Sequence, residues 1–213
     1  MIRLAIVVEG GTEEEFVTRL LYNHLLRMDV HTHPFLLGGL GGNVTVAKLA
    51  FDMWNYKTSH DAVTSLVDFY GFRDKGPSGV TDLTDAIIQA IEARTSHRVD
   101  RRSVVPYVQM HEFEGLLFSD VSKFSFVGLG EREIMALQQI RSQFPNPEEI
   151  NDDKHTAPSK RIQSLFPRYR KKVYGPLVVE RIGLSAVRAE CPGFDQWLTC
   201  LETLPETLSK TST

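Results

Sequence analysis

Five acidic residues follow the predicted ends of three β-strands, and they are the side chains of this chain best suited to metal-dependent chemistry. They are Glu9, Glu13, Asp68, Glu112 and Glu114. In an open parallel sheet, ligands bind beyond the carboxyl ends of the strands, so residues far apart in the sequence meet at one edge. Carboxylates gathered at one edge repel one another unless a cation compensates them. Because Mg²⁺ (or Mn²⁺) binds oxygen ligands and phosphate together, we expect a metal site there.

Phosphoryl transfer is the chemistry that such a site supports. Two ions about 4 Å apart would stabilise the attacking and leaving oxygens of an in-line displacement at phosphorus. Phosphodiester cleavage is the natural match, and the sequence contains no Cys/His cluster that would suggest zinc. In this interpretation Glu9 and Glu13 are catalytic as well as metal-binding, and Lys160 is the cation that stabilises the transition state.

A second group of residues is expected to contact phosphate. Gly10 and Gly11 allow a tight turn and a close approach of the backbone, and the helix that begins near Thr12 offers free N–H groups. The stretch from Lys154 to Lys172 is basic and contains no acid, which is typical of a solvated helix face or of a phosphate-contacting surface. The expected phosphate or substrate contacts are Gly10, Gly11, Thr12, His111, Arg161, Lys171 and Lys172.

Several of these residues also have a purely structural interpretation. Glu13 in a first helical turn favours the helix dipole without any catalysis, and Asp68 can form a turn. His111 beside a strand end can be a hydrogen-bonded neighbour. Glu112 and Glu114 alternate with Phe113, so an extended strand would place both on one face, which is unfavourable unless something binds them.

Hydrophobic periodicity predicts the elements that must bring these residues together. Strands are expected over residues 2–8, 31–37, 62–69 and 104–110. Helices are expected over residues 12–27, 43–56 and 81–97, the first with a capping box between Thr12 and Glu15. This alternation predicts an α/β fold with a mostly parallel four-stranded sheet and helices on both faces. The absence of Walker and Rossmann glycine motifs argues against ATP or NAD binding.

The pattern changes after residue 120. We expect an α/β core over residues 1–120 and a mainly helical extension over residues 121–213 that packs on it. A short helix is expected over residues 115–120, at the end of the core, and the helices of the extension are expected near residues 131–144, 158–166, 177–182 and 194–204. The last nine residues, 205–213, are polar and expected to be frayed.

Composition narrows the class of protein. A chain of 213 residues with 42% hydrophobic residues can bury the core of one domain, and a net charge of −3 gives no overall basic footprint. Cys191 and Cys200 indicate neither a disulfide framework nor a metal motif. No stretch has the length of a membrane span or the form of a signal peptide, so we expect a soluble, cytoplasmic protein that does not bind membranes.

The motif Glu9-Gly-Gly-Thr-Glu13 resembles the first motif of Toprim domains, which occur in topoisomerases, primases and OLD-family nucleases. Asp68-Phe-Tyr-Gly resembles their second motif, normally Asp-x-Asp, and Glu112-Phe-Glu114 resembles the later acidic motif of the OLD-type group. Nearly the whole chain is similar to a family of small stand-alone Toprim-like proteins of uncharacterised function. The C-terminal half contributes Pro158-Ser-Lys-Arg-Ile and Cys191-Pro-Gly-Phe-Asp-Gln-Trp197 to this resemblance.

This resemblance implies a Toprim-like sheet and the metal residues Glu9, Glu13, Asp68, Glu112 and Glu114. It also implies an ABC-type or AAA ATPase partner, since members of that family are often encoded beside an ATPase in bacterial defence loci. One residue departs from the pattern, because Tyr70 stands where the second aspartate normally lies. Either a metal ligand is lost, or Glu112 and Glu114 replace it.

Three functional hypotheses follow. The first is a Mg²⁺-dependent endonuclease that acts on DNA or RNA as an effector of bacterial defence. The second, which Tyr70 favours, is a catalytically degenerate Toprim-like subunit that docks on an ATPase and regulates it. The third is a phosphatase or nucleotide hydrolase with the same metal chemistry. The number of metal ions, the nucleic acid and the formation of a homodimer stay open.

Overall fold

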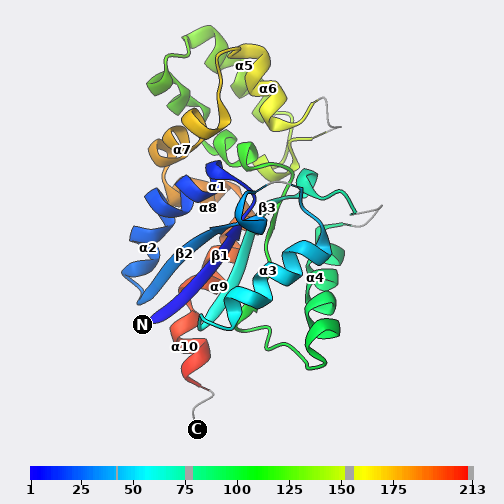
Figure 1. Ribbon diagram of the computed structural model, residues 1–213. Coiled ribbons are helices and arrows are strands. Elements are labelled where there is room, and N and C mark those ends of the chain that lie inside the picture. Colours follow the sequence, from blue (N-terminus) through cyan, green and yellow to red (C-terminus); the bar gives the residue numbers. More distant parts are fainter. Residues whose placement is uncertain (42, 75–78, 152–155, 211–213) are drawn as a thin grey trace.

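A computed structural model describes residues 1–41, 43–74, 79–151 and 156–210. Its sheet is built on β1 (Ile2–Val8), which lies between β2 (Val30–Leu36) and β3 (Ala62–Asp68). Two short strands, β4 (Val104–Val105) and β5 (Val108–Gln109), pair with β3 on its outer side. All pairings among these strands are parallel, so their carboxyl ends face the same edge, at the top of Figure 1.

Helices cover both faces of the sheet (Figure 1). On one face, α3 (Val46–Lys57) and α4 (Val80–Thr95) pack over the inward side chains of β1 and β3, such as Val7 and Val67. On the other face, α1 (Gly11–Phe16) and α2 (Tyr22–Leu26) share a core with the C-terminal helices. The α/β fold with a mostly parallel sheet, predicted from the sequence, is therefore confirmed.

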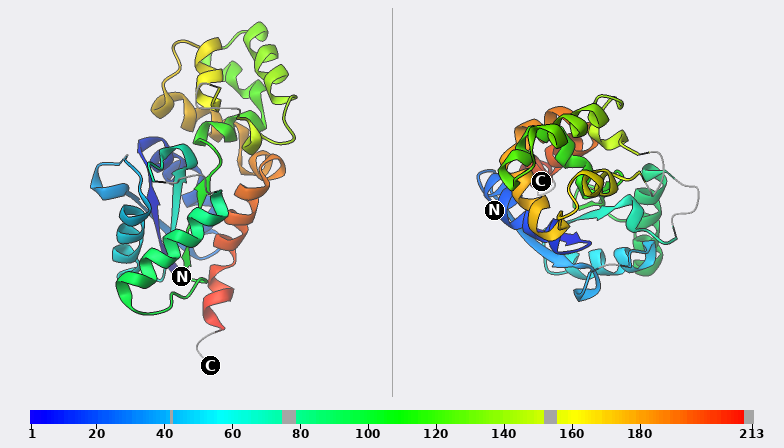
Figure 2. Two further views of the ribbon diagram at one scale, coloured as in Figure 1. Left: turned by 90° about the vertical axis from the view of Figure 1, so that its right-hand side faces the viewer. Right: turned by 90° about the horizontal axis from the view of Figure 1, so that it is seen from above.

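The chain beyond the sheet is helical and forms two groups. The first group lies above the carboxyl ends of the strands, at the top of both Figure 1 and the left view of Figure 2. It includes η4 (Phe113–Ser119), η5 (Val121–Val127), α5 (Glu131–Arg141), η6 (Pro147–Glu149), α6 (Pro158–Leu165) and α7 (Lys171–Ile182). The elements that then descend along the sheet are α8 (Leu184–Glu190), α9 (Pro192–Glu202) and α10 (Leu204–Ser209). No helix in the described ranges is long and apolar enough to cross a membrane.

The predicted fourth strand is interrupted. Pro106 has no N–H to donate to a ladder, and the backbone leaves the sheet between β4 and β5. Side chains of β3 fill the gap: Ser65 Oγ donates to the carbonyl of Tyr107 at 2.8 Å and accepts its N–H at 2.9 Å. The interruption is therefore stabilised by hydrogen bonds from the neighbouring strand.

Three other local predictions were wrong. The first helix begins at Gly11, because Gly10 is its N-cap and Glu13, not Glu15, completes the capping box. This helix continues through a π-helical turn, η1 (Val17–Leu21), into α2. Helix α7 begins at residue 171, six residues before the predicted start, since Pro176 is accommodated inside it. The C-terminal segment is helical to Ser209, with Leu204 buried, and residues 211–213 lie outside the described part.

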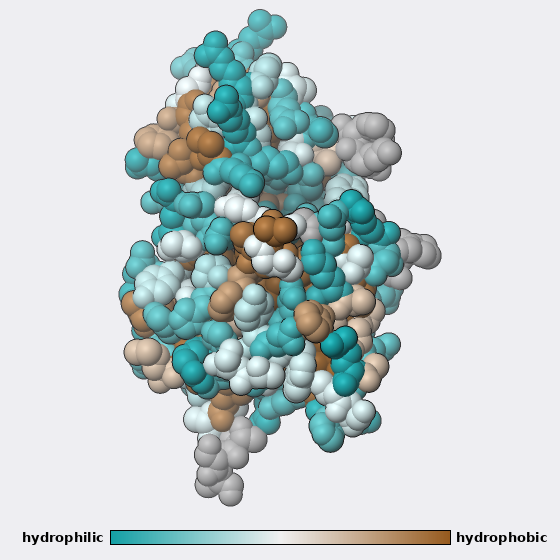
Figure 3. All heavy atoms as spheres, in the orientation of Figure 1, coloured by the Kyte–Doolittle hydropathy of each residue, from teal (hydrophilic) through white to brown (hydrophobic). Residues whose placement is uncertain are grey.

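The surface shows no broad apolar area on the face drawn in Figure 3. Hydrophobic atoms there form small separate patches among hydrophilic ones. Most of the hydrophobic side chains are instead in two cores, one on each face of the sheet.

Candidate active site

Backbone N–H groups at the strand ends hold three of the predicted acids in place. The Glu9 carboxylate, directly after β1, accepts the N–H of Asp68 at 3.1 Å. Asp68, the last residue of β3, accepts the N–H of Phe113 at 2.8 Å. Glu13, in the first turn of α1, accepts the N–H of Gly10 at 2.9 Å. The parallel topology thus links carboxylates that are up to 59 residues apart in the sequence.

Glu112 and Glu114 belong to the same cluster, but they lie in a different element from the one predicted. They do not lie in a strand, because Glu112 is the N-cap of η4 and Glu114 lies in its first turn. Both point to Lys171, whose Nζ donates to Glu114 at 2.9 Å and to Glu112 at 3.3 Å. The expectation that an extended strand aligns the two acids is wrong, but a cation does lie between them.

Two further groups hold this acidic pair. Glu112 accepts the N–H of Ser159, at the start of α6, at 3.0 Å. Glu114, which is almost fully buried, accepts the hydroxyl of Tyr169 at 3.3 Å. The C-terminal half of the chain therefore completes a site that the strands of the N-terminal half begin.

The carboxylates raise one another's pKa. Burial raises the pKa of Glu13 to about 8, and the charges of Glu9 and Glu114 add to the shift. Burial, followed by the charges of Glu13 and Glu9, holds the pKa of Asp68 well above its usual range. The pKa values of Glu9 and Glu114 are also raised, mainly by burial, although Lys171 opposes the shift at both. Such groups retain protons or bind cations near neutral pH.

Lys171 is the cation within this cluster. Burial lowers the pKa of its ammonium group, but the charges of Glu114, Glu112 and Asp68 outweigh that effect and leave the pKa raised. Lys171 therefore stays charged and compensates part of the negative charge. It was predicted only as a phosphate contact.

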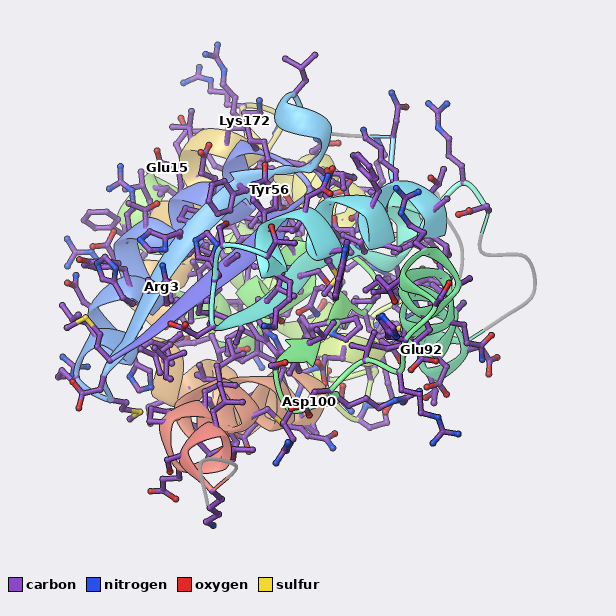
Figure 4. All side chains as sticks on the ribbon, turned by 60° about the horizontal axis from the view of Figure 1, so that its bottom comes forward. Arg3, Glu15, Tyr56, Glu92, Asp100 and Lys172 are labelled. Carbon is purple, nitrogen blue, oxygen red and sulfur yellow. The ribbon has the colours of Figure 1, made fainter. Side chains whose placement is uncertain are left out.

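An open cleft of about 480 Å³ lies next to the cluster. Its lining joins the glycine turn and first helix to the acids and to two lysines: Glu9, Gly10, Gly11, Thr12, Glu13, Glu14, Leu36, Leu40, Gly41, Asp68, Lys171 and Lys172. Gly10 and Gly11 thus line the cleft, and their contact with phosphate stays a prediction. Thr12 is buried, and its methyl group lies against Gly175 of α7. Lys172 extends past Gly11 beside the turn that follows β2 (Figure 4).

Other predicted contacts lie elsewhere. Lys160 is exposed on α6, and the lysine that donates to the acids is Lys171. Arg161 donates to the carbonyl of Thr156 at 2.6 Å and lies over the ring of Phe144, so it stabilises the local fold. His111 packs against the ring of Tyr70 at 5.4 Å between centroids. Lys154, at the start of the basic stretch, lies outside the described residues.

Two glycines shape the site, although the sequence did not identify them as functional. A Cβ on Gly71 would overlap the carboxylate of Glu9, and one on Gly41 would lie 2.5 Å from the Glu9 carbonyl oxygen. The signal was present, because Gly71 follows Asp68-Phe-Tyr and Gly41 belongs to the glycine cluster after the second strand. Both glycines give Glu9 the space that a larger residue would fill.

A divalent cation matches these donors in kind. Oxygens of Glu9, Glu13 and Asp68 are the ligands that Mg²⁺ prefers, and burial, with repulsion from neighbouring carboxylates, raises the pKa values of all three. The described ranges, however, contain no group of three His, Cys, Asp or Glu side chains arranged to hold a metal ion.

Comparison with known proteins gives the family. A family model described as a domain of unknown function (DUF4276) matches residues 8–202, which include the strand ends, the acids and α7. The chain belongs to the DUF4276 family. No curated protein matches its sequence.

Two solved structures of the C-terminal region of the Xanthomonas campestris pv. campestris OLD protein are similar to this DUF4276 chain. One, phased with iodine, has a TM-score of 0.43 and 16% identity and covers 99% of this chain and 98% of its own. The other, phased with platinum, has a TM-score of 0.41 and 17% identity, over 93% of this chain and 94% of its own.

Proposed function

We propose that this protein hydrolyses phosphodiester bonds of DNA or RNA with Mg²⁺ or Mn²⁺. One observation carries the proposal: carboxylates from the ends of β1 and β3 and from the first turn of α1 line one open cleft together with Lys171. Cleavage of a phosphodiester needs positive charge at the phosphoryl oxygens, a proton acceptor for the attacking water and a rigid frame. The cluster offers each of these from residues far apart in the sequence.

Each residue then has a defined task. A divalent cation on Glu9 and Asp68 would supply charge to the phosphoryl group and lower the pKa of an attacking water. Glu13, whose pKa is about 8, is matched to accept or return a proton near neutral pH. Lys171 would hold its charge beside the scissile phosphate, while Glu112 and Glu114 keep its Nζ in place. Lys172, at the rim of the cleft, would contact the adjacent backbone phosphate.

The test is cleavage of plasmid DNA, single-stranded DNA and tRNA in Mg²⁺, in Mn²⁺ and in EDTA. We expect cleavage only with metal, and we expect Glu9→Gln to reduce it about 100-fold or more. Glu15→Gln is the matched control, since Glu15 pairs with Arg19 on the surface of the same helical segment. Equal activity of Glu9→Gln and the wild type would remove the proposal. A panel of small phosphate esters separates a nuclease from a phosphatase.

A second candidate function is regulation of an ATPase by a catalytically inactive site. The ion pairs of Lys171 favour it, because they already neutralise part of the acidic cluster without a metal. Titration calorimetry with Mg²⁺ and Mn²⁺ at millimolar concentration distinguishes the inactive regulator from the nuclease. Heat of binding that disappears in Glu9→Gln supports the nuclease. The proposed role in bacterial defence is tested by loss of phage resistance in cells that carry Glu9→Gln.

A further inference from the structure

Leu40 is the most exposed of the large hydrophobic side chains in the described ranges, with 93% of its surface open to solvent. It belongs to the turn that follows β2, and it lines the same cleft as Glu9, Asp68 and Lys171. Other exposed hydrophobic side chains are partly covered; Arg181, for example, lies over the ring of Phe126 at 3.9 Å. A fully solvated leucine beside a cluster of charges contributes little to folding.

The turn is built so that Leu40 stays at the mouth of the cleft. Leu37 is fully buried, and its carbonyl accepts the N–H of Gly41 at 2.8 Å. Gly38 donates its N–H to the buried carboxylate of Asp52. Gly38 and Gly41 both have positive φ angles, and Gly41 lies directly against the Glu9 backbone. These contacts hold the backbone of the turn that carries Leu40 beside Glu9.

We propose that Leu40 inserts between neighbouring bases of a nucleic-acid strand whose phosphate lies at Glu9 and Lys171. This inference rests on the proposed nuclease function and names its substrate as a strand with unstacked bases, single-stranded or mismatched. Apolar side chains such as leucine act as wedges between bases, and unstacking the paired bases of a continuous duplex costs more energy than unstacking those of a single strand. The charges of Lys171 and Lys172 beside Leu40 suit the backbone phosphates of that strand.

The experiment uses Leu40→Ala, with Met135→Ala as the matched control, because Met135 is 64% exposed on α5 and does not line the cleft. Two Mg²⁺-dependent rates are compared, one for a single-stranded oligonucleotide and one for bis(p-nitrophenyl) phosphate, which has no adjacent bases. We expect Leu40→Ala to lower kcat/KM for the oligonucleotide about tenfold and to leave the small ester unchanged. A 2-aminopurine oligonucleotide bound in EDTA should brighten with the wild type and less with Leu40→Ala.

The outcomes separate this inference from the proposed function. If Leu40→Ala cleaves the oligonucleotide as fast as the wild type, or loses both substrates equally, the wedge is overturned while the nuclease stands. If the wild type cleaves neither substrate, the nuclease proposal fails. In that case a 2-aminopurine signal that depends on Leu40 still supports the wedge, and the absence of that signal overturns it.

Discussion

The ammonium nitrogen of Lys171 lies 2.9 Å from a carboxylate oxygen of Glu114. The two side chains differ in environment, since Glu114 is 1% exposed and Lys171 is 39% exposed. Lys171 therefore reaches into the site from its open side, and Glu114 forms the closed end. Because Lys171 is the first residue of α7, the position of that helix determines how much negative charge remains for a metal or a substrate.

Lys171→Met should lower the free energy of unfolding by about 2 kcal/mol. Loss of one partner of a fully buried ion pair costs about 3–5 kcal/mol, and the partial exposure of Lys171 reduces that figure. The loss should be larger above the raised pKa of Glu114 than below it, because a protonated Glu114 no longer needs the lysine. Urea unfolding measures it. Lys172→Met, on the neighbouring exposed residue, is the control, and an equal loss in both variants would contradict this view of the pair.

Glu13 should make the protein less stable as the pH rises. Burial raises the pKa of Glu13 to about 8, whereas in the unfolded chain the pKa of this residue is near its ordinary value of 4.5. The folded state thus retains a proton that the unfolded state loses, and the resulting stabilisation, complete at low pH, disappears as the pH rises toward 8. In EDTA, Glu13→Gln should remove a slope of up to ~1.4 kcal/mol per pH unit. Glu14→Gln, at the next position, should leave the slope unchanged.

The strand ends were predictable because short-range signals define them. Mainly apolar runs end at Val8 and Val67, the second interrupted by Thr64 and Ser65, and an acid follows each run directly. Parallel pairing then places Glu9 beside Asp68 whatever the details of the loops. This part of the site follows from hydrophobic pattern and topology alone.

The choice between Lys160 and Lys171 could not be made from the sequence. Both belong to one basic stretch with no acid in it. Lys171 reaches the acids because α7 packs closely on α1, where a Cβ on Gly175 would lie 3.2 Å from Thr12. Such a long-range contact has no local signature. Because proline is unfavourable inside a helix, Pro176 also led to a predicted helix start at residue 177 and not at Lys171.

Gly71→Ala should disturb the site without removing any charge. The φ angle of Gly71 is not positive, so alanine fits the backbone, but its Cβ would overlap the carboxylate of Glu9. We expect Glu9 to turn away from the Asp68 N–H and metal-dependent cleavage to fall about tenfold or more. Gly79→Ala is the control, because a Cβ there enters open space. Rates of oligonucleotide cleavage measure the effect, and a Gly71→Ala variant as active as the control would show that Glu9 needs no such space.

Three histidines form a separate cluster beside the edge strand β2, at a distance from the proposed chemistry. His33 contacts the ring of His31 at 4.7 Å and that of His60 at 5.1 Å between centroids. Burial lowers the pKa of His33, and the charges of His31, His60 and Arg3 lower it further. Each of these neighbours disfavours a proton on His33, so the folded state binds that proton more weakly than the unfolded chain does.

His33 should therefore reduce stability in acid. An unfolded histidine binds a proton below about pH 6.5, whereas His33 in the folded protein does so only at lower pH. The stabilising contribution of His33 is therefore present above about pH 6.5 and is lost as the pH falls below it. We expect His33→Gln to be less sensitive than the wild type between about pH 7 and pH 5. Thermal unfolding in EDTA measures the difference, and His97→Gln, on an exposed residue after α4, is the control. Parallel pH profiles for the wild type and His33→Gln would mean that folding does not lower the pKa of His33.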